Sequence, residues 1–272
     1  MSDRSRPFRF GAVLSLRENA MAWADAGREL EARGYSTLLV PDTLWTPSPF
    51  LVLSAVAART TRLRLGTWVL SAPLRRPAEV VREATTLQGL SDGRLELGIG
   101  AGRPGGERDA ASLGTEWGSP GDRVGRVRQV IAAVRAEVQP APSIVVAGQG
   151  DRMLRLAGEF ASTLALPTSP SADLEELERL TRRVGAVAGE GLELSLSVSG
   201  VGDDLPQWLR QQMGLTPDGL RRSGAVGLLS GDVELDAEAL RRVREQTGIS
   251  YWTVPGEFAT RLAPLVARLS GH

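Results

Sequence analysis

A carboxylate and a hydroxyl stand next to each other at Asp42 and Thr43 in the stretch LVPDTLW (39–45), one proline after the apolar residues 38–40. A short apolar run of this kind predicts the end of a buried strand, so both side chains leave a hydrophobic interior together. They are candidate catalytic residues, because a carboxylate can transfer protons and both groups can hydrogen-bond a substrate. The structural alternative is that they only cap a helix.

The composition excludes several other kinds of catalytic site. The chain of 272 residues has no cysteine and no lysine, and its one histidine is His272. Thiol nucleophiles, disulfides, thiolate metal sites and Schiff-base lysines are therefore excluded. A Ser-His-Asp triad or a histidine metal site is not expected from a residue at the chain end, where structure usually frays. Hydride chemistry supplied by a cofactor suits such a chain, because it needs positioning more than an ionisable side chain.

The charge balance argues against nucleic acid or a membrane surface as a partner. Arginine contributes all 32 basic residues, and 32 acidic residues balance them. No apolar stretch is long enough to span a membrane, and residues 1–9 are polar and basic without the apolar run of a signal peptide. We therefore expect a soluble cytoplasmic protein whose partner is a small-molecule substrate.

Strand and helix patterns alternate along the whole chain and must position these residues. Predicted strands cover residues 8–16, 36–42, 62–70, 94–102, 143–150, 162–168, 192–200 and 249–256. Predicted helices cover residues 19–34, 49–60, 77–93, 122–138, 151–160, 171–189 and 257–269. A longer polar connection containing the short segment 225–231 precedes the last strand. Eight strand–helix units in about 250 residues are typical of an α/β (β/α)8 TIM barrel, so a single domain is expected over residues 1–272.

A barrel places its active site at the carboxyl ends of its strands, where this chain has mostly glycines and small hydroxyls. The loops GIGAGRPGG (98–106) and VAGQGDRM (146–153) expose backbone N–H groups and favour phosphate, and the second loop leads directly into a helix N-terminus. Trp68 ends the third strand, either as a plug for the barrel interior or as a wall against a flat ring system.

The segments PDTL, RLRLGTWVL, RRPAEVVREATTLQGLSDGRLELGIGAG, DRVGRVRQVI and IVVAGQGDRMLRLA occur in this order and together span most of residues 10–161. In this order they resemble the luciferase-like superfamily of flavin- and deazaflavin-dependent oxidoreductases, and particularly its coenzyme F-420 class. The resemblance implies a TIM barrel and an 8-hydroxy-5-deazaflavin cofactor, with FMN as the alternative.

The resemblance also implies roles for individual residues. Trp68-Val69 matches a β-bulge that often holds a non-prolyl cis peptide behind the cofactor ring. Asp42 matches an acidic residue close to the ring, and Ser71 matches a polar residue near the edge of the ring. Ala101 and Gly102, together with the loop after the fifth strand, match segments that contact the cofactor's side chain and phosphate. The residues expected to bind the cofactor are Asp42, Thr67, Trp68, Val69, Ser71, Ala101, Gly102, Arg103, Ala147, Gly148, Gln149 and Gly150.

Three departures from the family pattern bear on function. Many deazaflavin enzymes have histidine where Thr43 stands, and the sugar-phosphate dehydrogenases have glutamate where Arg103 stands, which disfavours their substrates. The connection between the fourth helix and the fifth strand is also shortened, which truncates the roof over the substrate. We expect a coenzyme F-420-dependent reductase or dehydrogenase that moves hydride between deazaflavin C5 and a small or natural-product-type substrate, as a homodimer. The alternatives are an FMN-dependent monooxygenase and a non-catalytic cofactor-binding barrel.

Overall fold

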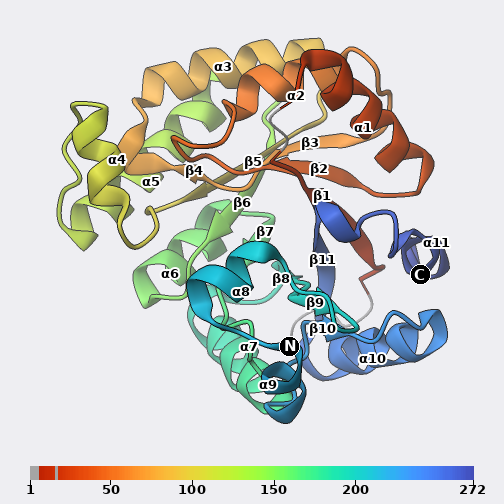
Figure 1. The fold of residues 1–272 in the computed structure, drawn as a ribbon. Helices are drawn as coiled ribbons and strands as arrows, with labels where there is room; N and C mark the ends of the chain where they lie inside the picture. The colour runs from red at the N-terminus through yellow and green to blue at the C-terminus, as the bar shows by residue number, and fades with distance from the viewer. Residues whose placement is uncertain (1–5, 16–17) are drawn as a thin grey trace.

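Parallel strands close into a barrel in the computed structural model, which describes residues 6–15 and 18–272 (Figure 1). In the described part of the chain, the barrel strands are β1 (Arg9–Val13), β2 (Thr37–Val40), β3 (Arg64–Thr67), β5 (Leu95–Gly100), β6 (Ser143–Ala147), β7 (Thr163–Ala165), β8 (Glu193–Ser197) and β11 (Ile249–Pro255). The short strand β4 (Leu70–Ser71) continues β3, and both pair with β5, which closes the barrel. The predicted TIM barrel is therefore confirmed.

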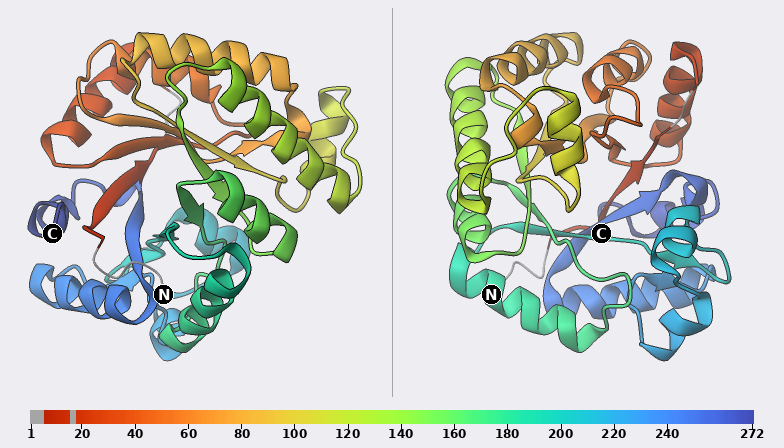
Figure 2. Two further views of the ribbon diagram at one scale, coloured as in Figure 1. Left: turned by 180° about the vertical axis from the view of Figure 1, so that it is seen from behind. Right: turned by 60° about the vertical axis from the view of Figure 1, so that its left-hand side comes forward.

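Helices surround the strands on the outside, as the two views of Figure 2 show. The outer helices are α1 (Ala20–Ala32), α2 (Pro49–Ala57), α3 (Pro77–Leu90), α5 (Pro120–Glu137), α6 (Asp151–Phe160), α7 (Leu174–Ala188), α10 (Val233–Thr247) and α11 (Ala263–Leu269). Side-chain caps fix several of their beginnings. The Asn19 side chain accepts a hydrogen bond from the Ala22 N–H at 3.0 Å, as the sequence predicts, and Ser119 and Asp122 form a capping box on α5.

The long connections between strands and helices carry further elements. They are η1 (Ala72–Leu74), α4 (Gly106–Ser112), β9 (Gly200–Val201), α8 (Gln207–Met213), α9 (Pro217–Arg222), β10 (Leu228–Leu229) and η2 (Gly256–Phe258). The extra segment predicted at residues 225–231 contains β10, which pairs with β9. The link between α5 and β6 is short, as expected, and spans residues 138–142.

Two helix predictions were wrong. Helix α10 falls within the region interpreted as a polar connection, because only a narrow stripe of apolar side chains, Ala237, Leu240 and Val243, is buried on an otherwise charged helix. The last helix begins at Ala263 rather than residue 257, because β11 is followed first by the 3-10 turn η2.

Glycines in the strands make room for larger side chains from neighbouring strands inside the barrel. A Cβ atom on Gly11 would lie 2.5 Å from the Tyr251 hydroxyl oxygen, and one on Gly66 would lie 2.4 Å from a Leu39 methyl group. Tyr251 is fully buried and fills the middle of the barrel. Glycine is needed at these strand positions because side chains from the neighbouring strands, Tyr251 of β11 and Leu39 of β2, occupy the space.

An ion cluster fills the barrel below Tyr251, at the amino-terminal ends of the strands. The Arg9 guanidinium donates to Glu96 at 2.9 Å and to Glu193 at 2.6 Å, and it lies 3.5 Å from the centre of the Tyr251 ring. The Thr163 hydroxyl donates to Glu193 at 2.7 Å. Residues at this end of a TIM barrel ordinarily serve stability.

The two ends of the described chain meet at the same amino-terminal side. The Phe8 N–H donates to the His272 carbonyl at 2.9 Å, and the Gly271 N–H donates to the Phe8 carbonyl at 3.0 Å. The single histidine therefore lies at the end of the barrel opposite the carboxyl ends of the strands. Within residues 6–15 and 18–272, none of the helices has the length and apolar character needed to cross a bilayer.

Candidate active site

Asp42 lies at the carboxyl end of β2, where the sequence places it, and it is held in an ion pair. The Arg75 guanidinium donates to both carboxylate oxygens, at 3.1 and 2.5 Å, and the Ser71 N–H donates to one of them at 3.2 Å. The Asp42 side chain is only 9% exposed. The carboxylate thus ties β2 to β4 and to the turn that follows it.

Thr43 lies in a turn and does not cap a helix. Its hydroxyl oxygen is 3.0 Å from that of Thr46, and its N–H donates to the Thr46 hydroxyl at 3.2 Å. Helix α2 begins only at Pro49. The partly exposed Thr43 hydroxyl therefore stands at the rim of the barrel, beside Asp42 in sequence.

The peptide bond between Trp68 and Val69 is cis, as the resemblance implied. The Trp68 ring meets the Tyr251 ring edge-on, with 6.1 Å between ring centroids. Trp68 and Val69 are both partly exposed, so the tryptophan closes the top of the barrel interior and keeps part of its surface at the mouth. The packing on Tyr251 agrees with the role of a plug, and the role of a wall against a ring system stays a prediction.

The side chain of the neighbouring Thr67 forms hydrogen bonds within the sheet. It is fully buried, its hydroxyl donates to the Gly98 carbonyl at 2.8 Å, and the Gly98 N–H donates to the hydroxyl oxygen at 2.9 Å. The side chain links β3 to β5 and has no surface at the mouth.

Tyr251 cannot supply a proton to the mouth. Burial, reinforced by the nearby Glu96 carboxylate, raises the pKa of its phenol far above the ordinary value. It also lies beneath Trp68, in contact with Arg9 from the other side. Its role is to support the tryptophan.

The first glycine-rich loop is shaped by an aromatic side chain of its own connection. A Cβ on Gly102 or on Gly106 would lie 2.3 Å from the Trp117 ring, and Gly102 has a positive φ of 88°. The Arg123 guanidinium donates to the Ala101 carbonyl at 3.1 Å and stacks on the same tryptophan ring. Packing of Trp117 therefore explains Gly102 without any phosphate.

Arg103 connects two loops at the rim. Its guanidinium donates to Asp109 of α4 at 2.6 Å and lies 4.3 Å from the centre of the Trp45 ring in the β2–α2 connection. These three side chains line a cavity of about 580 Å³ together with Gly105, Glu107 and Arg108.

The second glycine-rich loop leaves open space in front of a helix N-terminus. Helix α6 has Gly150 at its N-cap, and among the described residues no side chain accepts a hydrogen bond from its first N–H groups. No heavy atom lies within 4 Å of a Cβ built on Gly150, whereas one on Gly148 would lie 2.8 Å from the Met153 Cβ. Ala147 and Gly148 are partly exposed, and Gln149 and Gly150 are exposed. Free N–H groups at a helix N-terminus form an anion-binding geometry.

One polar pair at the mouth was not among the predicted site residues. The hydroxyl oxygens of Ser197, at the end of β8, and Thr253 of β11 lie 2.8 Å apart, with Ser197 exposed and Thr253 buried. Alternation along the strands would have found them, because both side chains point into the barrel next to each other.

Comparison with known proteins gives a consistent family. Residues 7–212 match the sequence profile of luciferase-like monooxygenases. A phthiodiolone/phenolphthiodiolone dimycocerosates ketoreductase of Mycobacterium sp. (strain JLS) is 27% identical over 280 residues, covering 83% of this chain and 70% of the relative. An F420-dependent glucose-6-phosphate dehydrogenase of Beutenbergia cavernae is 36% identical over 115 residues, covering 39% of this chain and 33% of the relative. The crystal structure of a riboflavin lyase with modified FMN and riboflavin superposes with a TM-score of 0.73 at 15% identity, covering 97% of this chain and 92% of that one.

Proposed function

The chain belongs to the luciferase-like monooxygenase family, and from this premise we propose that it is a coenzyme F-420-dependent oxidoreductase that acts as a reductase. When bound, the deazaflavin exchanges a hydride at its C5 with the substrate. The substrate is a small or natural-product-type organic molecule with a ketone or another polarised double bond.

Two relatives support this assignment over FMN chemistry. One is named as a ketoreductase and the other as F420-dependent, and both are similar in sequence and not only in fold. The fold alone does not choose the cofactor, since the riboflavin lyase structure contains a modified FMN. The glucose-6-phosphate activity of the second relative is not carried over, because Arg103 stands where that class has glutamate.

The open N-terminus of α6 is the observation that carries the proposal. The free N–H groups after Gly150 and the space in front of them would hold the anionic tail of the cofactor. Trp68, Val69 and Ser71 would contact the ring, with Asp42 fixing the segment that bears Ser71. Ala101 and Arg103 would line the path between ring and tail.

The proton that accompanies the hydride comes from water in this proposal. Asp42 is bound on both oxygens, Tyr251 is sealed below Trp68, and His272 lies at the other end of the barrel. The Thr43 hydroxyl at the rim can donate to the substrate and accept from water, but it cannot act as a base at neutral pH.

Titration of the purified protein with coenzyme F-420 and with FMN, followed by fluorescence, tests the assignment. We expect micromolar binding of F-420 and at least tenfold weaker binding of FMN. Stronger FMN binding would favour a monooxygenase, and binding of neither would favour a degenerate, non-catalytic barrel that has lost the cofactor.

The substitution Gly150→Leu tests the proposed phosphate position. The residue has φ −74° and ψ 146°, which any residue adopts, and a Cβ atom at this position has no heavy atom of the described residues within 4 Å apart from its chain neighbours. We expect F-420 affinity to fall at least tenfold, with a loss of unfolding free energy of only about 1 kcal/mol, because leucine is a poorer N-cap than glycine. Gly185→Leu on α7, where a Cβ also meets nothing within 4 Å, is the matched control. Unaltered affinity in Gly150→Leu would remove the phosphate from this loop.

A further inference from the structure

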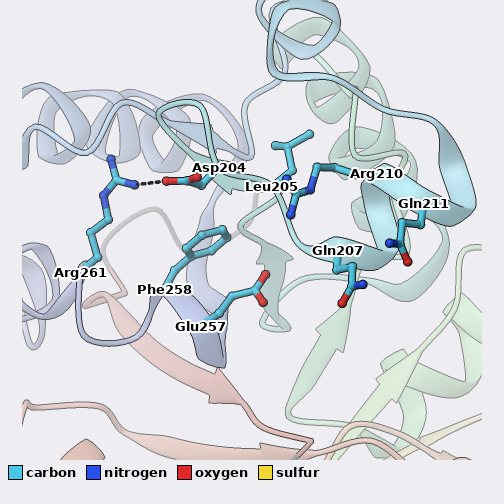
Figure 3. Close-up of a pocket in the computed structure, with 8 residues that line it drawn as sticks. All are labelled: Asp204, Leu205, Gln207, Arg210, Gln211, Glu257, Phe258 and Arg261. Carbon is cyan, nitrogen blue, oxygen red and sulfur yellow. Dashed lines mark hydrogen bonds and ion pairs between the residues drawn. The ribbon is translucent and has the colours of Figure 1, made fainter.

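A second cavity, of about 720 Å³, opens between α8 and the turn that follows β11 (Figure 3). Its lining comes from α8 and the segment before it, and from η2 and the residues after it: Asp204, Leu205, Gln207, Arg210, Gln211, Glu257, Phe258 and Arg261. Because η2 follows the carboxyl end of β11, the cavity lies on the same face of the barrel as Trp68 and Thr43. No part of the cofactor site proposed above uses it.

Helix α8 turns its polar side toward this cavity. Gln207, Arg210 and Gln211 are spaced by three and four residues, so they share one face of the helix, and all three line the cavity. Trp208 and Met213 lie elsewhere on the helix and are 51% and 49% exposed. An ordinary surface helix buries its large apolar side chains and exposes its amides and charges. Helix α8 buries Leu209, which is 1% exposed, while Gln207, Arg210 and Gln211 are exposed and open to a ligand in the cavity.

Two of the four charged side chains that line the cavity form an ion pair with each other, and the other two have no partner among the described residues. Arg261 donates to Asp204 at 2.9 Å and to the Val201 carbonyl at 3.1 Å, so it clamps β9 (Figure 3). The side chains of Arg210 and Glu257 have no hydrogen-bond or ion-pair partner among the residues that the structure describes. They come from opposite walls, α8 and η2, and bring one positive and one negative charge to the same space.

We propose that this cavity is the subsite for a zwitterionic group of the substrate, a carboxylate next to an amine as in an amino acid. Arg210 binds the carboxylate, for which a guanidinium is the matching donor. Glu257 accepts from the ammonium group, the amides of Gln207 and Gln211 complete the hydrogen bonds, and Leu205 and Phe258 contact the apolar part. The inference names the substrate class for the proposed reductase and so rests on that function.

Saturation-transfer NMR with three probes tests the subsite directly. L-Phenylalanine carries both charges, phenylalaninamide lacks the carboxylate, and N-acetylphenylalanine lacks the ammonium group. We expect phenylalanine to bind at least fivefold more tightly than either derivative. In Arg210→Gln the preference over the amide disappears, and in Glu257→Gln the preference over the acetyl compound disappears. Arg59→Gln and Glu137→Gln, which change exposed charges near the amino-terminal ends of the strands, are the matched controls and retain both preferences.

Equal binding of the three probes, or preferences that survive in both variants, would overturn the subsite. The same proteins are titrated with coenzyme F-420, which separates this proposal from the function on which it rests. Loss of probe discrimination with unchanged F-420 affinity supports both proposals. Discrimination without any F-420 binding overturns the substrate role, because the proposed function has then failed, and leaves a binding site of the same chemistry.

Discussion

The sequence predicts the position of Asp42 correctly but does not reveal its role. The apolar run before it predicts its position at the carboxyl end of β2, and the structure has it there. Its partner Arg75 lies 33 positions further along the chain, and no local pattern reveals such a pair. With both oxygens bound, Asp42 acts on the site through β4 and Ser71 rather than by offering a free carboxylate.

Two substitutions test whether Asp42 positions β4 or contacts the cofactor directly. If Asp42 positions β4, then Asp42→Asn and Arg75→Gln break the same ion pair, and we expect both to weaken F-420 binding by a similar factor of about three to ten. Each should also lower the free energy of unfolding by about 1 to 3 kcal/mol, the range for hydrogen bonds to charged groups. Chemical denaturation and fluorescence titration measure the two effects. A much larger loss of affinity in Asp42→Asn than in Arg75→Gln would instead show direct contact with the cofactor.

Glycines at the site show the same limit of sequence reasoning. Both glycine-rich loops were predicted as ligand loops, but Gly102 and Gly106 make room for Trp117, whereas Gly150 borders open space. Sequence identifies glycine in either case. Only the path of the chain tells whether the missing side chain makes room for the protein or leaves room for a ligand.

At the scale of elements, the repeating strands and helices were predictable because buried parallel strands are nearly continuous apolar runs. Elements whose stability depends on tertiary contacts could not be predicted from the sequence. Helix α10 buries too narrow a stripe to stand out, and α4 and α8 are single short helices within long connections. Such short helices gain their stability from packing rather than from propensity. One of these unpredicted elements, α8, forms a wall of the second cavity.

The junction between α1 and β3 contains a carboxylate whose effect depends on pH. One oxygen of Glu31 accepts from the N–H groups of Thr61, Arg62 and Leu63, at 3.0, 2.5 and 2.8 Å. Partial burial raises the pKa of Glu31, but these N–H groups outweigh it and hold the pKa below the ordinary value. A carboxyl with a lowered folded pKa stabilises the fold above its unfolded pKa, and this contribution is lost as pH falls through the folded pKa.

Replacement of Glu31 by glutamine should therefore matter at neutral pH and not in acid. We expect Glu31→Gln to reduce the free energy of unfolding by about 1 to 2 kcal/mol at pH 7, as for hydrogen bonds to a charged group. The difference from the unmodified protein should shrink as the pH falls below about 4. Urea denaturation across this range measures it, with Glu29→Gln on the same helix as control. A difference that stays constant with pH would mean that the charge of Glu31 contributes nothing.

The stabilising ion cluster and the candidate functional site lie at opposite ends of the barrel. The amino-terminal end holds the Arg9, Glu96 and Glu193 cluster, while the carboxyl-terminal end carries Trp68, the open α6 N-terminus and both cavities. Tyr251 lies between them and contacts both Arg9 and Trp68. The barrel pattern made this division predictable, but the ion cluster was not, because its members come from strands far apart in sequence. The homodimer stays a prediction.

Two variants at opposite ends test whether stability and binding are separate. Glu193 accepts from Arg9 and Thr163, so Glu193→Gln removes one buried charge while Tyr251 and Trp68 themselves stay unchanged. We expect this variant to lose about 2 to 4 kcal/mol of unfolding free energy. The reason is that the Arg9 guanidinium then keeps only one of its two carboxylate partners, Glu96. Its F-420 affinity should stay within twofold of the unmodified protein, measured well below the unfolding temperature. Gly150→Leu should show the reverse, with weakened binding and a loss of stability of only about 1 kcal/mol from the poorer N-cap. If Glu193→Gln weakens binding as well, then the ion cluster determines the position of Trp68 through Tyr251, and the two ends of the barrel act as one unit.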